Sequence, residues 1–535
     1  MTDNSSSPVG TTPSPVGTTT GMDRRWWTLI AVCGATFMLL VDVTIVQVAL
    51  PTMQRELDAS FAQLEWVISA YALSLAALLL TQGTLADRFG RKRIFVAGLT
   101  IFTLASLTCG LANSAIFLIV GRAVQGVGGA AMFATSLALI GQDFRGKDRG
   151  TAIAAWGATV GGAVAVGPLA GGALTSGLGW RWIFFVNVPI GIATLVVSLK
   201  RMVNVSDPDT KRLDVAGLLT FSGALFLLIL GLTRGNDDGW SSAFILTLFC
   251  SSAVLFAAFV FAEFHQDRPM FDLSLFRNPA FTGVSLATFA IGAGMFAMLT
   301  YLTLYLQDLL GLSPLQGGLR ILPLTVLTFV VPLVTRNLGE RTPPGTALGV
   351  GLALSAVGLA LMHGVAASSS WTTLLPGLIL GGLGIGIANP AIAKIALGVV
   401  SPERSGMASG ISNTFRIGGL ATGVAGLGAL FQGRISASLT SALGHPAGTL
   451  ATVVAAEGTR GADAPMLARA HMTRVAGNAF SLGINDLLVT GAAVVFIGAL
   501  FAVLVRRKDF PQPPSPPAAA PVPDTEPEML AEAAP

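Results

Sequence analysis

Residues 39–51 read LLVDVTIVQVALP, a run of mainly apolar side chains that contains one ionisable group, Asp42. An unpaired carboxylate is costly in any low-dielectric environment, whether a protein core or hydrocarbon. The apolar sequence around it extends from residue 27 to residue 49, and a helix of that length crosses the roughly 30 Å of a bilayer core. The stretch therefore predicts a membrane-spanning helix that carries a carboxyl group at membrane depth.

The composition of the whole chain agrees with a membrane protein. Of its 535 residues, 11% are charged and 52% are hydrophobic, and the mean hydropathy is +0.71. Soluble domains carry about 25% charged residues. The net charge of +4 does not indicate a nucleic-acid partner, because the basic residues occupy short segments between apolar runs and form no single basic face. The expected partner is the lipid bilayer.

Fourteen apolar segments are long enough to cross a bilayer, since roughly 20 residues of helix span its hydrocarbon core. We therefore predict an all-α membrane protein with fourteen transmembrane helices. The predicted spans cover residues 27–49, 64–86, 94–112, 115–140, 151–176, 182–201, 213–233, 242–262, 280–308, 318–337, 345–364, 373–398, 406–431 and 487–507.

The distribution of Lys and Arg predicts how these spans are oriented. If the N-terminus is cytoplasmic, the cytoplasmic segments carry 21 of these residues and the external loops carry eight. Because basic residues are retained on the cytoplasmic side, we predict a plasma-membrane protein with both termini in the cytoplasm. Both ends are low in the large apolar side chains that fold a core, so residues 1–25 and 508–535 are predicted to be disordered.

The sequence also repeats at a spacing of 256 residues. This shift places Gly126 on Gly382 and Gly128 on Gly384, so spans four and five correspond to spans 12 and 13. Internal repeats of this kind are typical of secondary transporters. We predict two six-helix bundles at residues 26–201 and 280–507, two inserted spans within residues 202–279, and an external loop at residues 432–486.

The segment GTLADRFGRKRIF, residues 83–95, joins the second and third spans. It combines glycines, one acid and four bases, which together can hold two helix ends by charged hydrogen bonds. An anchor for the cytoplasmic side is the alternative interpretation, but an anchor needs only the bases.

Residues 83–95 resemble motif A of the major facilitator superfamily. This resemblance implies that the segment gates the transporter through Gly83, Asp87, Arg88, Gly90 and Arg91. The segments LLVDVTIVQVALP, GRAVQGVGGA from Gly121, GPLAGG from Gly167 and WRWIFFVNVPIG from Trp180 resemble further signatures of its fourteen-span drug:proton antiporter family. The resemblance extends over nearly all of residues 25–507. It implies the major facilitator fold, with two six-helix bundles and two inserted helices, and export of small molecules by alternating access coupled to proton entry. The second-half counterpart of motif A has Arg336 in place of Asp87, which argues against a symmetric charge lock.

Asp42 and Arg122 are the residues predicted to couple transport to protons. Ionisable groups within spans face the bundle interior and mark ion or substrate paths, and burial brings a carboxyl group toward the range in which it exchanges protons. The family resemblance implies that Arg122 faces the interior near the coupling acid, where it pairs with that acid or with an anionic substrate. The alternative interpretations are a structural polar pin for Asp42 and a structural arginine for Arg122.

The segment GPLAGG resembles motif C, the antiporter signature. Pro168 cannot donate a backbone hydrogen bond to the carbonyl group of Val164, so the fifth span is expected to bend there. The glycines leave a smooth side on which another helix can pack closely. We predict that Gly167, Pro168, Gly171 and Gly172 contact a helix of the second half, although ordinary small-residue packing is the alternative.

A further group of residues is predicted to line the cavity. Arg416 is a second-half partner for the coupling site or, alternatively, an arginine whose side chain extends to the inner membrane surface. For the two tyrosines in the group, packing against neighbouring helices is the alternative role. Glu65 and Glu263 flank spans and are interpreted as interfacial, whereas Asp308 and Arg320 are expected to be solvated or paired with each other. The predicted cavity residues are Gln125, Tyr301, Tyr305, Asn413 and Arg416.

The preferred function is a proton-coupled secondary antiporter, and two alternatives are compatible with the sequence. Residues Gly146–Lys147 are followed by Asp148, so the sequence lacks the phosphate-binding loop through which ATP would drive transport. No cofactor or metal site is predicted, and an enzyme is not expected. The partners are a small hydrophobic or amphipathic substrate and protons, and the chain is expected to act as a monomer. The alternatives are uptake or facilitated diffusion of a solute, and a transporter-like membrane sensor.

Overall fold

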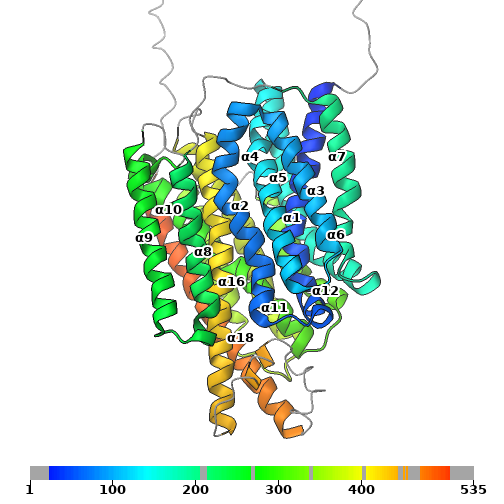
Figure 1. Cartoon of the computed structure of the whole chain (residues 1–535), viewed down its shortest axis with the longest axis vertical. Coiled ribbons are helices and arrows are strands. Elements are labelled where there is room, and N and C mark those ends of the chain that lie inside the picture. Colours follow the sequence, from blue (N-terminus) through cyan, green and yellow to red (C-terminus); the bar gives the residue numbers. More distant parts are fainter. Residues whose placement is uncertain are drawn as a thin grey trace, which may run out of the picture.

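The structure is a computed structural model that describes residues 23–204, 214–266, 271–335, 342–400, 405–443, 450–451, 454–455 and 470–506. The described elements are all helical, and most of them run side by side along one axis (Figure 1). Thirteen helical segments are long and apolar enough to cross a membrane. The fifth predicted span corresponds to α5, Gly146–Gly177, whose 32 residues also suffice to span the bilayer. The all-α membrane fold is confirmed, and fourteen spans are consistent with it.

The first half of the chain contains the helices that position the predicted site. They are α1 (Arg24–Leu57), α2 (Phe61–Phe89), α3 (Arg91–Gly110), α4 (Ala115–Asp143), α5, α6 (Trp182–Phe185) and α7 (Asn187–Arg201). Two inserted helices follow, α8 (Val215–Asp238) and α9 (Ala243–His265), and they stand side by side at the left of Figure 1. The helix α8 packs against α2 and α16, so the inserted pair borders both halves.

The second half begins with a short 3₁₀ helix, η1 (Leu273–Arg277), followed by a long composite helix in which α-helical and π-helical segments alternate. The parts of the composite helix are α10 (Pro279–Ile291), the π-helical η2 (Gly292–Phe296), α11 (Ala297–Leu304) and the π-helical η3 (Tyr305–Leu309). The remaining elements are α12 (Pro314–Val334), α14 (Pro344–Leu361), η4 (Trp371–Leu374), α15 (Leu375–Gly398), α16 (Ser405–Leu443), α18 (Ala470–Leu500) and η8 (Phe501–Leu504).

Matching glycine contacts in the two halves agree with the predicted repeat. A Cβ atom on Gly126 would lie 2.5 Å from the Tyr71 carbonyl oxygen in α2, and one on Gly382 would lie 2.5 Å from the Leu324 carbonyl oxygen in α12. The neighbouring Gly128 packs equally closely on α3, as Gly384 does on α14. Only residues without side chains allow such approach of two backbones. The same pair of contacts therefore recurs at the predicted shift of 256 residues.

The beginnings of α2 and α12 provide a second match between the halves. Ser60 and Gln63 form a capping box at the start of α2, with hydrogen bonds of 2.9 and 3.3 Å. Ser313 and Gln316 form the same box at the start of α12. Each box satisfies two backbone N–H groups that the start of a helix leaves without partners.

The predicted external loop at residues 432–486 is helical at both of its ends. The helix α16 continues to Leu443 and α18 begins at Ala470, and Figure 1 shows both extending beyond the other helices. The apolar pattern ended the thirteenth span at residue 431 because polar and small residues follow it, but those residues continue the helix. Most of residues 444–469 and the predicted disordered ends, apart from residues 23–25, lie outside the described residues.

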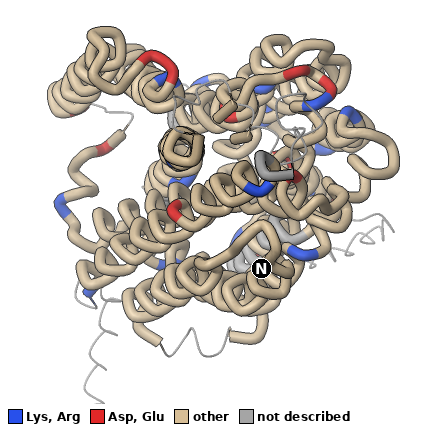
Figure 2. The backbone as a smooth tube through the Cα atoms, turned by 90° about the horizontal axis from the view of Figure 1, so that it is seen from below, with Lys and Arg blue, Asp and Glu red and all other residues tan. Residues whose placement is uncertain are grey.

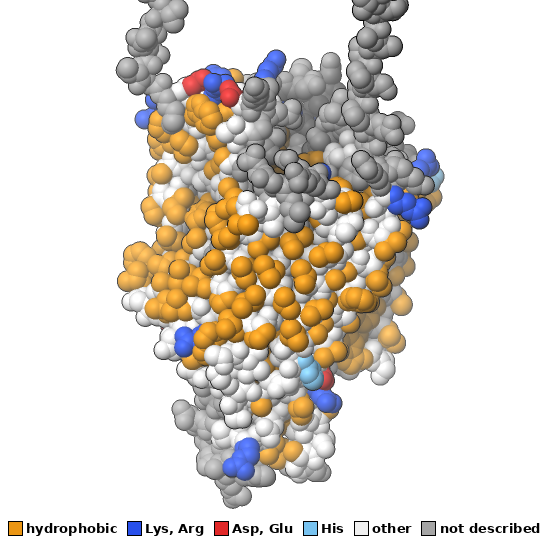
Figure 3. All heavy atoms as spheres, turned by 180° about the vertical axis from the view of Figure 1, so that it is seen from behind, with side chains coloured by type: hydrophobic (Ala, Val, Ile, Leu, Met, Phe, Trp, Pro, Cys, Tyr) orange, Lys and Arg blue, Asp and Glu red, His pale blue; other side chains and the backbone are white. Residues whose placement is uncertain are grey.

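The surface of the helix bundle has the polarity of a protein that contacts lipid. Figure 3 shows hydrophobic side chains across the middle of one face, with Lys and Arg near its margins. Large apolar side chains on the inserted helix α9, including Val254, Phe261 and Phe264, are about two-thirds exposed. In Figure 2, charged positions are few along the tubes. An apolar exterior of this kind is stable in a bilayer and is unusual for a soluble monomer.

Candidate functional site

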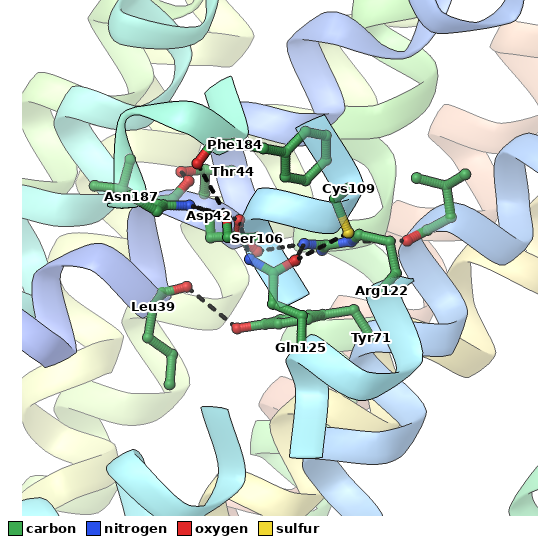
Figure 4. Close-up of polar contacts among 12 residues, drawn as sticks. Leu39, Asp42, Thr44, Tyr71, Ser106, Cys109, Arg122, Gln125, Phe184 and Asn187 are labelled. Carbon is green, nitrogen blue, oxygen red and sulfur yellow. Dashed lines mark hydrogen bonds and ion pairs between the residues drawn. The ribbon is translucent and has the colours of Figure 1, made fainter. Parts of the chain in front are cut away.

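Asp42 on α1 and Arg122 on α4 form a direct ion pair inside the first half of the bundle (Figure 4). Arg122 Nη1 donates to Asp42 Oδ2, and the two side chains are 2% and 0% exposed. Both residues interrupt apolar helical surfaces, which is why they were visible in the sequence. The structure brings together the two residues predicted to couple protons, and it seals them from solvent.

Gln125 completes a closed triangle with this ion pair. It lies three residues after Arg122 on α4, so the two side chains leave the same face of the helix. Arg122 Nη1 donates to Gln125 Oε1 at 2.7 Å, while Gln125 Nε2 donates to Asp42 Oδ1 at 2.9 Å. Gln125 was predicted to line the cavity, and here it is fully buried and orients both charged groups.

Asn187 adds a donor from a third helix, α7. Its Nδ2 atom lies 3.3 Å from Asp42 Oδ1 and 3.0 Å from Ser106 Oγ on α3, and Ser106 Oγ donates to the Phe184 carbonyl oxygen at 3.0 Å. Asp42 Oδ1 therefore receives hydrogen bonds from α4 and α7. One carboxylate oxygen thus links α1 to both of these helices.

The guanidinium of Arg122 is held by further contacts with α2. Its Cζ atom lies 4.1 Å from the centre of the Tyr71 ring, and its Nε atom donates to the Val67 carbonyl oxygen at 3.2 Å. Tyr71 is in turn placed by a 3.4 Å hydrogen bond from its hydroxyl to the Leu39 carbonyl oxygen. A cation over a desolvated aromatic face gains about 2 kcal/mol, so α2 contributes to holding the arginine.

Asn187, Ser106 and Tyr71 were not predicted as site residues. Asn187 belongs to the segment WRWIFFVNVPIG that suggested the family, but its position gave it no role. A single amide, hydroxyl or phenol in a span is common, and the sequence does not reveal which face of the helix it occupies. The available signal was the presence of Asn187 in an otherwise apolar span, because a buried amide requires polar partners.

The energetics of this cluster make it sensitive to loss of either charge. Two buried ions are expensive to desolvate, and their mutual attraction and hydrogen bonds offset that cost only while both are present. Adding a proton to Asp42 removes the negative charge and leaves Arg122 with neutral partners. The arrangement can therefore convert binding of one proton into a change in the contacts of a buried arginine.

The segment that resembles motif A joins α2 to α3 through Gly90. Its φ angle of +103° is one that side chains other than glycine rarely adopt, and a Cβ atom there would collide with Asn204. Gly83 faces open space, and the guanidinium of Arg88 lies over the ring of Phe89. The side chain of Asp87 and the counterpart residue Arg336 lie outside the described residues.

The basic residues of this segment tie the start of α3 to neighbouring helices. Lys92 Nζ donates to the carbonyl oxygens of Leu199 and Met202, at 2.9 and 2.8 Å, at the end of α7. Arg91 Nη1 donates to the Ala138 carbonyl oxygen of α4 at 3.3 Å. These bonds lie within the first half, and the proposed role of the segment in gating stays a prediction.

The glycines of the segment that resembles motif C face two different helices. Cβ atoms on Gly167 and Gly171 would collide with or press against Thr44 and Ile45 of α1, within the first half. A Cβ atom on Gly172 would instead lie 2.6 Å from the carbonyl oxygen of Pro314 in α12. The expected contact with a second-half helix is therefore found at Gly172, but Gly167 and Gly171 pack against α1.

Pro168 lies within α5, which continues through it from Gly146 to Gly177. Its carbonyl oxygen is in close contact with Gly318 of α12. Gly172 and Gly318 are thus smooth positions on opposite sides of the α5–α12 contact. Because both are glycines, the two halves approach here at backbone distance.

The second-half residues predicted to line the cavity do not join the Asp42 cluster. Tyr301 and Tyr305 are buried, and their hydroxyls bond to the carbonyl oxygens of Val424 and Ala366. Asn413 lies on α16 one turn before Arg416, whose Nε atom is buried and has no hydrogen-bond partner among the described residues. Their role in lining the cavity stays a prediction.

Four ionisable residues differ from their predicted environments. Glu65 and Glu263 were interpreted as interfacial but are 5% and 3% exposed, because neighbouring helices cover them. Asp308 was expected to be solvated or paired with Arg320, but it is 3% exposed. Arg320 donates to the Gln316 carbonyl oxygen and lies over the ring of Trp371 instead. Proximity to a predicted span end was therefore a poor guide to exposure, since it ignores which face of the helix each residue occupies.

Comparisons with known proteins agree with this architecture. The profile described as Major Facilitator Superfamily matches residues 32–426, and this range contains Asp42, Arg122, Gln125 and Asn187. The chain belongs to the major facilitator superfamily. It is therefore a transporter by family and not an enzyme, as predicted.

Several proteins named for resistance to antibiotics are similar to this chain over most of their length. The chain is 32% identical to a tetracenomycin C resistance and export protein of Streptomyces glaucescens, over 81% of this chain and 80% of that protein. It is 35% identical to a multidrug resistance protein of Mycobacterium tuberculosis, over 77% of both chains. It is 34% identical to a puromycin resistance protein of Streptomyces alboniger, over 80% of this chain and 86% of that protein.

A solved structure shows the same fold. The chain superposes with a TM-score of 0.60 on an inward-facing, unoccupied bacterial homologue of the human lysosomal transporter Spinster. The match covers 92% of this chain and all of that one, at 18% sequence identity. The major facilitator fold predicted from the sequence is confirmed.

Proposed function

We propose that this member of the major facilitator superfamily is a secondary antiporter that exports a small hydrophobic or amphipathic compound in exchange for protons. The observation that carries the proposal is the sealed Asp42–Arg122 ion pair at the centre of the first bundle. The relatives named for antibiotic or multidrug resistance support export and a drug-like substrate.

In the proposed cycle, Asp42 exchanges one proton for each change of partner by Arg122. While Asp42 is ionised, its negative charge balances the positive charge of Arg122, and Gln125 forms hydrogen bonds with both groups. When Asp42 takes a proton, Arg122 must find other acceptors or move toward water, because an uncompensated buried charge is unstable. Because protonation changes the partners of Arg122, the proton and the substrate bind with different affinities to the different conformations of the protein. Coupling requires such a difference.

The proposed orientation places motif A on the cytoplasmic side of the plasma membrane. The start of α1, the end of α4 and the start of α5 lie at the motif A end, where Arg25 bonds to Asp148 and Thr28 bonds to Asp143. The excess of basic residues in segments predicted at this end supports the assignment. Both halves of the transport path come from one chain, which supports action as a monomer in the bilayer.

The halves contact each other at the end opposite motif A. Gln307 Nε2 of η3 donates to the Val48 carbonyl oxygen of α1 at 2.7 Å, and the Leu315 backbone nitrogen of α12 donates to Ser176 Oγ of α5 at 3.0 Å. In the proposed orientation this end faces outward. The conformation described here is then closed to the outside.

Two measurements test the proposal. A strain lacking its own efflux pumps and expressing the protein is screened for growth tolerance against a panel of hydrophobic and amphipathic antibiotics. Each compound to which tolerance rises is then tested in inverted membrane vesicles, where an imposed pH gradient, acidic inside, should drive its accumulation. Accumulation that is unaffected by collapse of the gradient would rule out proton exchange, and movement in the opposite direction would indicate uptake.

A further inference from the structure

Glu65 is a buried carboxyl group on the surface of α2 that faces the second half. It lies four residues after Phe61, the first residue of α2, and so about 6 Å along the axis from the end opposite motif A. It is 5% exposed. The ion pair of Asp42 and Arg122 does not include it, and the proposed coupling leaves it without a role.

Residues of the second half enclose the Glu65 carboxyl. Its Oε1 atom lies 3.3 Å from the hydroxyl of Tyr301 on α11. A Cβ atom on Gly428 of α16 would collide with the carboxyl and lie 2.7 Å from the Tyr301 hydroxyl. Gly428 therefore provides the space in which the carboxyl meets the second half. Aromatic rings of Phe61 and Phe431, whose centres are 5.9 Å apart, cover the same contact.

The neighbouring charges do not stabilise an ionised Glu65. Among the described residues, no Lys, Arg or His forms an ion pair with it. The titratable and charged groups that act on it are Tyr301 of α11 and Asp237 of α8, and the second of these is negative. A carboxylate placed here would be desolvated and would have no positive partner.

The hydrogen bonds of Tyr301 also indicate a protonated carboxyl. The Tyr301 hydroxyl contacts both Glu65 Oε1 and the carbonyl oxygen of Val424, and the contact with Val424 is the shorter one. A phenol has one proton to donate, and a carbonyl oxygen can only accept. When that proton goes to Val424, the contact with Glu65 is a hydrogen bond only if Glu65 donates its own proton to the tyrosine oxygen.

We propose that Glu65 is a second proton-carrying carboxyl of the transport cycle, which takes a proton from the outside and must be neutral for the outer end to close on Tyr301 and Gly428. When the halves separate at this end, Glu65 meets water and can ionise. The ionised group then opposes closure, because closure would strip its water. The inference rests on the proposed orientation and on proton coupling, but it concerns a group separate from Asp42.

The test measures closure of the outer end without any substrate. Spin labels are attached to cysteines introduced at Gly177 of α5 and Gln316 of α12, in the full chain with Cys33, Cys109 and Cys250 replaced by serine. Both labelled positions are exposed, and they adjoin the bond between the Leu315 backbone and Ser176, which is left intact. The distance between the labels is measured in lipid nanodiscs at a series of pH values.

In the parent protein, the short-distance population should grow as the pH falls, with the closed-to-open ratio changing by at most about tenfold per pH unit for a single proton. Glu65→Gln is neutral at every pH and keeps the shape of the side chain, so it should stay closed throughout the series. Tyr301→Phe removes the hydrogen bond but keeps the titrating group, so it should retain a pH response. A Glu65→Gln protein that retains the parent response would overturn the proposal.

Two further variants complete the test. Gly428→Ala places a methyl group in the space of the carboxyl, so the open population should increase at every pH, and an unchanged distribution would contradict the proposal even where Glu65→Gln does not fold. Asp42→Asn should retain the pH response of the outer end. If Asp42→Asn abolishes the response and Glu65→Gln keeps it, the inference about Glu65 fails while proton coupling through Asp42 stands.

Discussion

Gly172 of α5 lies directly against the carbonyl oxygen of Pro314 in α12, whereas its neighbour Gly171 faces Ile45 of α1. A Cβ atom on Gly172 would lie 2.6 Å from the Pro314 carbonyl oxygen, and one on Gly171 would lie 2.9 Å from the Ile45 carbonyl oxygen. Adjacent residues on a helix point about 100° apart, so one short glycine segment serves two interfaces. One interface joins the two halves, and the other lies inside the first half.

We expect Gly172→Val to reduce transport much more than it reduces the amount of folded protein. Overpacking costs about 1–3 kcal/mol, and at this position the cost falls on the closed outer end alone. Gly171→Val places the same side chain between α1 and α5, so it should lower thermal stability in every conformation. Gly157→Val is the matched control, since a Cβ atom there meets nothing within 4 Å. Substrate accumulation in vesicles and melting of purified protein separate the three outcomes.

If Gly172→Val transports normally, the contact between α5 and α12 does not control the cycle. Equal loss of folded protein for Gly171→Val and Gly172→Val would indicate that both glycines act in packing only. The sequence could not show which of the two glycines faces α12 and which faces α1, because this depends on the rotation of α5 about its axis.

The ion pair between Asp42 and Arg122 gives the second prediction. Asp42→Asn preserves size but leaves Arg122 buried without a negative partner, which costs about 3–5 kcal/mol when one member of a buried pair is removed. We expect loss of gradient-driven transport together with a lower melting temperature. Adding Arg122→Gln removes the unpaired charge, so the double variant should melt at a higher temperature than Asp42→Asn and still fail to transport.

The measurement is a double-mutant cycle on thermal stability, with vesicle transport recorded for each variant. Additive effects of the two substitutions would show that the charges do not stabilise each other. Normal gradient-driven accumulation by Asp42→Asn would remove Asp42 from the coupling mechanism.

The sequence was informative where a residue was unusual for its surroundings. Asp42 and Arg122 each interrupt an apolar run, and the family resemblance implied that they lie near each other. The structure brings them into contact. The spans, the repeat and the family were likewise apparent, because apolar length and glycine spacing are properties of the chain itself. These features do not depend on how a helix is rotated in the bundle.

Helix rotation and the contacts between distant segments were not predictable. Asn187 and Tyr71 are ordinary residues for a span until the structure places them beside Asp42 and Arg122. Glu65 was assigned to the membrane surface because it lies near a span end, but α11 and α16 bury it. Each of these errors concerns the direction in which a side chain points.

Asn187 provides the third prediction. Asn187→Leu removes the donor to Asp42 and the bond to Ser106 while keeping a similar volume. Leaving buried polar groups unsatisfied costs about 1–3 kcal/mol, so thermal stability and transport should both fall. Ser106→Ala is the matched control, because it removes one partner of Asn187 and leaves the contact with Asp42 intact. Transport by Asn187→Leu at the level of Ser106→Ala would show that Asn187 supports packing and not the carboxylate.

The orientation in the membrane gives the last prediction. Ala437, near the end of α16, and Arg93, in the segment that resembles motif A, are both exposed and lie toward opposite ends of the bundle. A single cysteine is introduced at each position in a background lacking Cys33, Cys109 and Cys250. If motif A is cytoplasmic, as the excess of basic residues predicts, Ala437→Cys should react with a membrane-impermeant maleimide in intact cells. Arg93→Cys should react only after lysis, and the reverse pattern would invert the proposed direction of closure and place Glu65 at the cytoplasmic end.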